Sequence, residues 1–368
     1  MKKSIIALAA IMFLFVLDFY GQQNANQPPD LPIDAATKTQ IINDLTKELN
    51  ESYVFGETAK KMETDVKQRL QNKEYDKITS SREFAERLTN DLQGVSRDKH
   101  LRVRFSFDKI PARQDNREPS KEEQENYSRF VRQINFGFEK IERLQGNIGY
   151  IDLRGFSDAE LGVETVAAAM NFLTNTDALI FDLRQNGGGS PEMVALISSY
   201  LFGEKPVHLN SLYWRKGDKT EEFWTKGTVA GKRYGETKDV YILTSNRTFS
   251  AGEEFTYNLK NLKRATIVGE TTGGGAHPGG MFRINDHFGA FVPTGRAISP
   301  VTKTNWEGTG VEPDIKVPKE LALKTAYALA LNKVADKTAD EQRKKALKEL
   351  ADKAQKEIDE MKKVAKTN

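Results

Sequence analysis

The sequence predicts an α/β protein, α+β overall, whose core contains parallel strands. From residue 146 onward, short apolar runs typical of buried strands alternate with segments of helical periodicity; the runs include "NIGYIDLRGF", "DALIFDLR", "DVYILTS" and "ATIVGE". Such alternation is typical of parallel sheets, because a chain needs a crossover, usually a helix, to start the next parallel strand. We therefore expect the core over residues 146–320, with helical segments on either side.

A small helical domain is expected over residues 30–95, because apolar residues recur there at helical spacing. Ser80 and Glu83 have the spacing of a capping box at the start of its third helix. The three apolar stripes are Ile41, Leu45 and Leu49, then Met62, Val66 and Leu70, and finally Phe84, Leu88 and Leu92.

Residues 96–145 are expected to form a strand followed by a polar linker. Leu101, Val103 and Phe105 alternate with polar residues, as in a half-buried strand, whereas residues 107–133 are polar and contain two prolines. The last segment, 321–368, is expected to be helical and highly charged. Its heptad spacing of Leu347, Ala354 and Met361 leaves two alternatives open, a solvated amphipathic tail and a coiled-coil dimer seam.

The chain begins like a secretory signal peptide over residues 1–22. Lys2 and Lys3 precede an apolar run from Ile5 to Leu17 that is short for a membrane span. An uncleaved anchor is the alternative. Because the sequence has no cysteine, a lipoprotein linkage and disulfides are excluded. We expect a secreted or periplasmic bacterial protein with no stable membrane span once the signal is removed.

The charge balance gives no sign of a nucleic-acid partner. Fifty-five basic and 52 acidic residues give a net charge of +3, and the two signs are mixed along the chain rather than gathered in stripes. A metal site is not expected, because the four histidines are scattered and no two have helical ligand spacing. No cofactor is expected either, and the oligomeric state stays open. The histidines are His100, His208, His277 and His287.

Three consecutive glycines follow the apolar strand in "FDLRQNGGGS", residues 181–190. Glycine is favoured where φ is positive or where another group approaches the backbone closely. A phosphate-binding loop is excluded, because no Lys-Ser/Thr follows and the dinucleotide fingerprint is absent. An oxyanion hole and a tight turn into the next helix remain as explanations.

An oxyanion hole requires a nucleophile, and "TSNRTFSAGEEF" supplies Ser250 as the candidate. Ser250 lies between an apolar strand and a helix expected to begin near Ala251, so its hydroxyl would face the sheet's edge beside the first helical N–H groups. The alternative is an ordinary helix cap. Glu253 and Glu254 are expected to form a solvated face and a charge pair at the helix N-terminus.

Four motifs together resemble the tail-specific or C-terminal processing serine peptidases. They are "ALIFDLRQNGGGS", "TFSAGEEF", "ATIVGETTGGGAHPGG" and "EGTGVEPDIKVP", and the resemblance covers most of residues 35–335. Within that family, "DKHL" and "QINFGFEKIERLQGNIGYIDLRGF" look most like the branch that contains interphotoreceptor retinoid-binding protein and the tricorn core protease. The resemblance implies a ClpP/crotonase-like core behind the helical N-terminal domain.

The resemblance also implies the site residues. The processing peptidases use a lysine base after the "GE.T.G" motif, but here no lysine lies between Glu270 and Arg283. The tricorn-like arrangement instead implies His100 as the base and Glu307 as its orienter. The oxyanion would then accept hydrogen bonds from the N–H groups of Gly188 and Ala251.

Two departures from the family pattern leave questions open. Lys99 replaces a linking serine before His100, which makes Asp98 a rival orienter. The polar segment 107–133 is too short for the PDZ module that reads substrate C-termini in the tail-specific peptidases, so substrate selection must have another basis. His277, in the glycine-rich loop, could line the site, but a surface loop position is favoured.

The sequence as a whole predicts a secreted serine peptidase that hydrolyses peptides or unfolded proteins. One alternative is a catalytically inactive relative that binds an apolar ligand or a protein partner, and another is a scaffold that acts through the charged C-terminal helix. The co-occurrence of Ser250, His100 and Glu307 favours the enzyme, because a binding module needs none of them as a set.

Overall fold

The computed structural model describes residues 29–112 and 120–367, and the predicted signal peptide lies outside them. The chain divides into two compact units. The first, here called the helical unit, contains the described residues up to Tyr127 with Leu212–Glu221 and His277–Ala297. The second, the core unit, contains Ser128–Ser211, Glu222–Ala276 and the chain from Ile298 onward.

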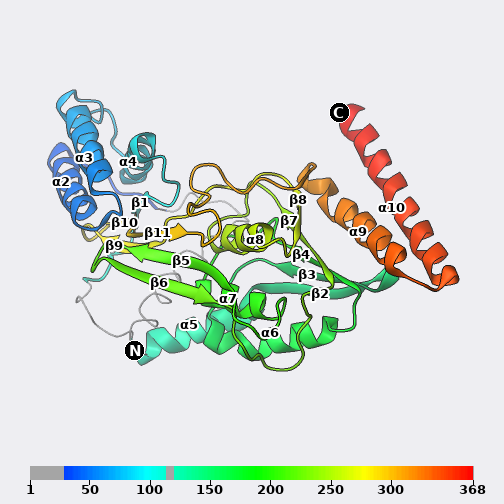
Figure 1. Cartoon of the computed structure of the whole chain (residues 1–368). Helices are drawn as coiled ribbons and strands as arrows, with labels where there is room; N and C mark the ends of the chain where they lie inside the picture. The colour runs from blue at the N-terminus through cyan, green and yellow to red at the C-terminus, as the bar shows by residue number, and fades with distance from the viewer. Residues whose placement is uncertain (1–28, 113–119, 368) are drawn as a thin grey trace. The chain divides into compact units, whose positions relative to one another are not determined.

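The helical unit confirms the predicted helical N-terminal region (Figure 1). Asp34 and Ser80 cap their helices by accepting hydrogen bonds from Thr37 N at 2.7 Å and Glu83 N at 3.0 Å. The apolar stripes pack with an antiparallel sheet of order β1-β10-β9, so the helices cover that sheet. The elements are α2 (Ala35–Ser52), α3 (Gly56–Gln71), α4 (Ser81–Ser96), β1 (Arg102–Phe105), β9 (Gly279–Arg283) and β10 (Phe288–Pro293).

A helix that the sequence analysis did not anticipate, α5 (Lys121–Gln133), occupies the second half of the expected polar linker. It begins with a capping box, in which Glu123 N donates to Ser120 Oγ at 3.2 Å and Ser120 N donates to the Glu123 carboxylate at 2.6 Å. Val131 is buried, but most of the helix is polar and exposed. Apolar periodicity therefore could not reveal this helix, although the Ser-x-x-Glu spacing could.

The core unit contains a six-stranded sheet of order β12-β8-β7-β4-β3-β2. Every neighbouring pair is parallel except β2 with β3, which confirms the predicted parallel strands. The strands are β2 (Phe138–Leu144), β3 (Ile148–Leu153), β4 (Ala178–Asp182), β7 (Asp239–Thr244), β8 (Thr266–Gly269) and β12 (Ile315–Lys316).

Both faces of this sheet are covered, which explains the continuous apolar runs of its central strands. On one face, Ile180 and Leu243 belong to a cluster with Leu331 and Ala326 of helix α9. On the other face, Phe181 packs against Phe255 of α8 with ring centroids 5.2 Å apart. The helices are α6 (Ala159–Leu173), α7 (Pro191–Ser199), α8 (Ala251–Asn261) and α9 (Lys319–Lys337).

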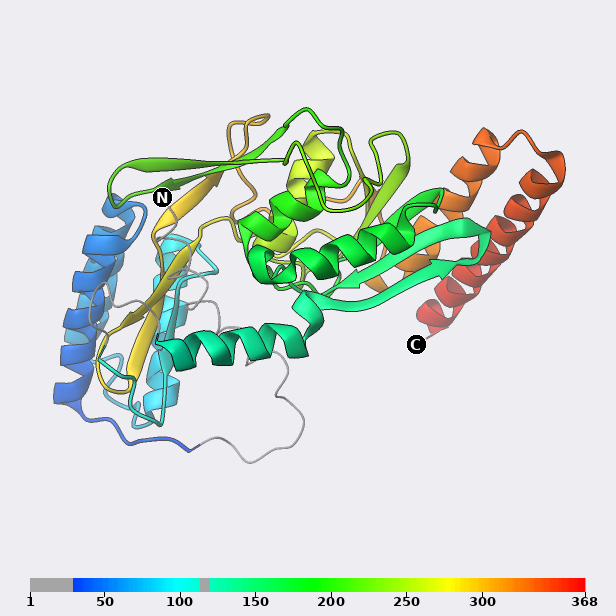
Figure 2. The same cartoon turned by 90° about the horizontal axis from the view of Figure 1, so that it is seen from below.

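The charged C-terminal helix α10 (Glu341–Thr367) packs back along α9 (Figure 2). Its buried residues are Leu347, Ala351, Ala354 and Ile358, whose 4-3-4 spacing is that of a two-helix seam. The apolar stripe is therefore buried against α9 within the chain, and neither alternative, a solvated tail or a dimer seam, describes this face of the helix.

The remaining elements are a three-stranded sheet and two short 3₁₀ turns. The sheet has the order β11-β5-β6. Within residues 29–112 and 120–367, no helix has both the length and the apolar character that crossing a bilayer requires. The elements are β5 (His208–Trp214), β6 (Lys219–Trp224), β11 (Gly295–Ile298), η1 (Asn135–Gly137) and η2 (Gln145–Asn147).

The contact of α9 with the sheet predicts a measurable loss of stability. Leu331 is fully buried between the sheet and α10, so Leu331→Ala should lower the free energy of unfolding by about 2–5 kcal/mol. Denaturant unfolding measures this, with Leu161→Ala, a 39% exposed leucine, as the matched control. Equal losses in both variants would contradict the described packing.

Candidate active site

Three loops of the core unit meet at one edge of its sheet. They follow β4, β7 and β8, which are adjacent and parallel, so their carboxyl ends lie together (Figure 1). Backbone hydrogen bonds join the loops, from Phe249 N to Asn186 O at 3.0 Å and from Gly273 N to Thr248 O at 2.9 Å. The edge formed by the carboxyl ends of parallel strands is where open α/β sheets bind ligands.

Ser250 lies at this edge, in the turn from β7 to α8. Its backbone has φ 54° and ψ −122°, and its side chain is half-buried. A positive φ is rare for a residue with a Cβ and costs on the order of 1–3 kcal/mol. Such strain is typical of a serine held on a sharp strand-to-helix turn, where the hydroxyl is presented at the top of the sheet.

Gly188 lies directly against Ser250. It has φ 108°, and a Cβ placed on it would lie 2.7 Å from Ser250 Cβ and 3.1 Å from Ala251 N. The glycine is therefore required by close approach as well as by its backbone conformation. Its N–H donates to Asn186 Oδ1 at 2.9 Å, whereas Ala251 is the first residue of α8, where N–H groups have no partner within the helix.

Glu253 joins the turn that contains Ser250 to the glycine-rich loop that follows β8. Its side chain is fully buried, so the expectation of a solvated face is wrong. One carboxylate oxygen accepts from Thr272 Oγ1 and Gly274 N, both at 2.6 Å, and the other accepts from Gly275 N at 2.8 Å and Ser250 N at 3.0 Å. Burial raises the pKa of Glu253 to about 7, against the lowering effect of these donors.

Glu254 is buried as well, with 4% of its surface exposed. Burial raises the pKa of its carboxyl to about 8, although the amides of Asn210 and Asn258 oppose the shift. The predicted charge pair at the start of α8 is therefore wrong: both glutamates follow Ser250 into the interior. The Ser-x-x-Glu spacing of Ser250 and Glu253 was the one signal in the sequence that pointed to a link between them.

Glu307 binds the same glycine-rich loop. Its carboxylate accepts a hydrogen bond from Ala276 N at 2.5 Å, and the indole of the preceding Trp306 donates to Gly275 O at 2.7 Å. The structure thus places Glu307 against the backbone immediately before His277.

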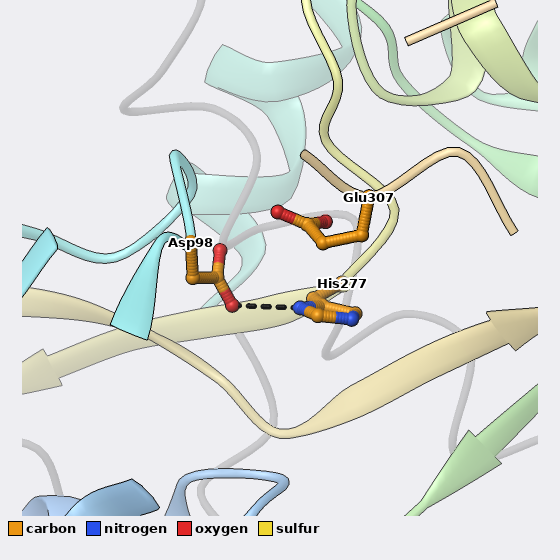
Figure 3. A group of neighbouring side chains, drawn as sticks. All are labelled: Asp98, His277 and Glu307. Carbon is orange, nitrogen blue, oxygen red and sulfur yellow. Dashed lines mark hydrogen bonds and ion pairs between the residues drawn. The ribbon is translucent and has the colours of Figure 1, made fainter. Parts of the chain in front are cut away.

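The helical unit contains a histidine–carboxylate pair that the sequence analysis did not identify (Figure 3). His277 Nδ1 and Asp98 Oδ2 are 2.8 Å apart, and the same oxygen accepts from Tyr53 OH at 3.1 Å. The other oxygen, Oδ1, accepts from the backbone N–H of His100 at 3.0 Å. His277 is 6% exposed, so its expected position in a surface loop is wrong.

His100, the predicted base, is also buried in the helical unit. Its ring stacks on Phe291 with centroids 5.9 Å apart, and burial lowers its pKa to about 4. The other two histidines have structural contacts: His208 stacks on Trp224, and His287 Nδ1 lies 3.1 Å from Ser106 O.

The raised pKa of Glu253 predicts a pH-dependent contribution to stability. The folded chain holds this proton more tightly than the unfolded chain, so the contribution is full below about pH 4.5 and is lost as pH rises through about 7. Between pH 5 and 8, the wild-type protein should lose about 2–3 kcal/mol through this group, and Glu253→Gln should lack that part of the dependence.

Denaturant unfolding of both proteins at pH 5 and pH 8 provides the measurement, with the exposed Glu160→Gln as the matched control. Because all other groups are common to the two proteins, only Glu253 enters the difference between them. An unchanged pH dependence in Glu253→Gln would contradict the assignment.

Comparisons with known proteins identify the family of the chain. The profile of peptidase family S41 matches residues 147–317, and the profile of the N-terminal domain of peptidase S41 in eukaryotic IRBP matches residues 35–139. Carboxyl-terminal-processing peptidase 1 of Arabidopsis thaliana chloroplasts is 27% identical over 185 residues, which cover 50% of this chain and 36% of the relative.

Carboxyl-terminal-processing peptidase 2 of the same plant is 30% identical over 173 residues, 47% of this chain and 32% of the relative. The chain thus aligns with about a third of the length of each. The solved structure of a putative peptidase from Parabacteroides merdae covers 82% of this chain and 99% of its own, with 20% identity and a TM-score of 0.57, and shares the fold. The two profiles together show that the chain belongs to peptidase family S41, a family of serine proteases.

Proposed function

We propose that this protein is a serine-type peptidase that hydrolyses peptide bonds in protein or peptide substrates, with Ser250 as its nucleophile. The observation that carries the proposal is the strained backbone of Ser250, at the carboxyl edge of the sheet and in contact with Gly188. A serine that only caps a helix needs neither the positive φ nor the contact with a glycine. A nucleophilic serine benefits from both, because the sharp turn presents its hydroxyl to the substrate and the glycine leaves room beside it.

In the proposed reaction, Ser250 Oγ attacks the scissile carbonyl carbon while its proton passes to an imidazole nitrogen. The carbonyl π electrons move to oxygen, which becomes the oxyanion. The C–N bond then breaks as the carbonyl reforms, and the leaving amine takes the proton from the imidazolium. Water next attacks the acyl carbon and gives a proton to the imidazole, and the Ser250 oxygen leaves with that proton as the acid product is released. The family resemblance assigns the base to His100 and its orientation to Glu307, and this assignment stays a prediction.

The oxyanion would accept hydrogen bonds from Ala251 N–H and Gly188 N–H. Ala251 begins α8, so its N–H lies at the positive end of the helix dipole. Gly188 N–H donates to Asn186 Oδ1, so this amide must share or exchange that acceptor when the oxyanion forms. Donors of this kind are worth about 3–4 kcal/mol of barrier each.

We also propose an exported location and a preference for accessible chain segments. The basic start and apolar run of residues 1–22 support export. The names of the Arabidopsis relatives state carboxyl-terminal processing for those proteins, and chain termini are accessible segments, so we expect cleavage near the termini of a substrate.

Ser250→Ala should abolish peptide hydrolysis while changing the free energy of unfolding by no more than about 1 kcal/mol, the size of a helix cap. Cleavage of an unfolded model protein, read by mass spectrometry, measures the activity. Ser80→Ala is the matched control, because Ser80 also precedes a helix and accepts from Glu83 N. Full activity in Ser250→Ala would exclude Ser250 as the nucleophile.

Gly188→Ala should lower kcat by about 100-fold or more while changing KM by less than about 3-fold, because the oxyanion exists only after attack. Steady-state kinetics on a fluorogenic peptide separates the two constants. Gly235→Ala is the control, since Gly235 has φ 93° but nothing within 4 Å of an added Cβ. A change confined to KM would instead indicate that Gly188 contacts the substrate backbone.

A further inference from the structure

We infer that Asn186 is a positioning residue of the proposed oxyanion hole, and this inference rests on the proposed peptidase function. Its side chain fixes the amide of Gly188 and sets how closely the glycine run approaches the start of α8. The contacts that carry the inference all lie within the core unit, between the end of β3, the loop after β4 and the first turn of α8.

Asn186 is fully buried, and both its side chain and its backbone are hydrogen-bonded. Nδ2 donates to Leu153 O at the end of β3, and Oδ1 accepts from Gly188 N, both at 2.9 Å. The backbone N–H donates to Leu183 O, and the backbone oxygen accepts from Phe249 N, both at 3.0 Å. Asn186 therefore joins β3, the loop after β4 and the turn between β7 and α8.

Asparagine fits this position because its short amide offers a donor and an acceptor side by side. An aspartate carboxylate could accept from Gly188 N–H but could not donate to Leu153 O, and a glutamine amide stands one methylene farther from the backbone. Since a buried peptide N–H without a partner is costly, Asn186 Oδ1 also satisfies the Gly188 amide before a substrate binds.

Gly188 is held on its other side as well. Phe156 N donates to Gly188 O at 2.8 Å, and Ser190 N donates to Phe156 O at 2.6 Å. With its oxygen bound to Phe156 and its N–H bound to Asn186, Gly188 has little freedom to reorient. The N–H can then share its hydrogen with an oxyanion without rearrangement of the loop, and donors fixed in advance in this way lower the barrier most effectively.

Asn186 also contacts α8, at Gly252, the second residue of that helix. A Cβ placed on Gly252 would lie 2.7 Å from Asn186 Oδ1 and 3.2 Å from Cγ, and its three nearest atoms all belong to Asn186. Glycine is among the weakest helix formers, so its presence in the first turn indicates that this close approach is required.

The proposed oxyanion donors, the N–H groups of Gly188 and Ala251, reach one oxygen only if their separation is fixed. Their segments touch, because a Cβ on Gly188 would lie 3.1 Å from Ala251 N. Asn186 is hydrogen-bonded to the first segment and packs against the second, at the residue after Ala251. It thus sets this separation, and a displacement of about 1 Å in a catalytic site can lower the rate about 100-fold.

The test is a double-mutant cycle of Asn186→Ala and Gly252→Ala in the full chain. Each single substitution should lower kcat by about 30-fold or more and change KM by less than about 3-fold. Asn186→Ala removes the support of the Gly188 N–H, whereas Gly252→Ala adds a Cβ that displaces Asn186 Oδ1.

The double variant should be no slower than Asn186→Ala, because the atoms that Gly252→Ala displaces are then absent. The Cβ that remains at position 186 lies 3.4 Å from the added Cβ, an ordinary contact. Gly94→Ala, in helix α4, is the matched control, since nothing lies within 4 Å of an added Cβ there, and its kcat should equal that of the wild type.

A peptide aldehyde and the corresponding peptide alcohol separate positioning from folding. Ser250 Oγ gives its proton to the base and adds to the aldehyde carbon, and the carbonyl electron pair moves to the oxygen in the oxyanion hole, whereas the alcohol forms no adduct. Both single variants should bind the aldehyde more weakly by the factor by which kcat/KM falls, and should bind the alcohol as the wild type does. A merely structural role would weaken both ligands or neither.

Independent, multiplicative losses of kcat in the double variant, or an unchanged kcat in Gly252→Ala, would overturn the inference. Gly252→Ala keeps every hydrogen-bonding group of Asn186, so it decides the matter even if Asn186→Ala does not fold. In these outcomes the wild type still hydrolyses peptides and Ser250→Ala does not, so the peptidase proposal stands. A wild-type protein that neither cleaves peptides nor binds the aldehyde would instead remove the proposed function itself.

Discussion

One buried carboxylate, that of Glu253, holds the candidate active site of the core unit together. It accepts four hydrogen bonds, from the backbone of Ser250 and from three donors of the glycine-rich loop after β8. The positive φ of Ser250 is a strained conformation, and strain persists only where neighbouring contacts fix it. Glu253 and the close approach of Gly188 are the contacts that do so here.

The arrangement follows from the order of the strands. Because β4, β7 and β8 are adjacent and parallel, the glycine run, the turn that contains Ser250 and the loop bound by Glu253 all leave the same edge of the sheet. In the helical unit, Asp98 and His277 form a buried pair of their own.

Much of this could be predicted from the sequence, because local patterns determine it. Apolar runs located the strands, helical spacing located α2 to α4, and the motifs around Gly188 and Ser250 located the edge of the sheet. Burial of Glu253 and His277 could not be predicted, since both lie in polar or glycine-rich stretches and are buried by residues distant in sequence. The packing of α10 on α9 was missed for the same reason: a heptad stripe does not identify its partner.

The most direct measurement is to treat the protein with a fluorophosphonate, digest it, and locate the modified residue by mass spectrometry. We predict a single adduct, on Ser250 of the folded protein, because the reagent reports the activated hydroxyl. Modification of a different serine, or equal labelling of Ser250 in the unfolded protein, would contradict the claim that the structure activates this residue.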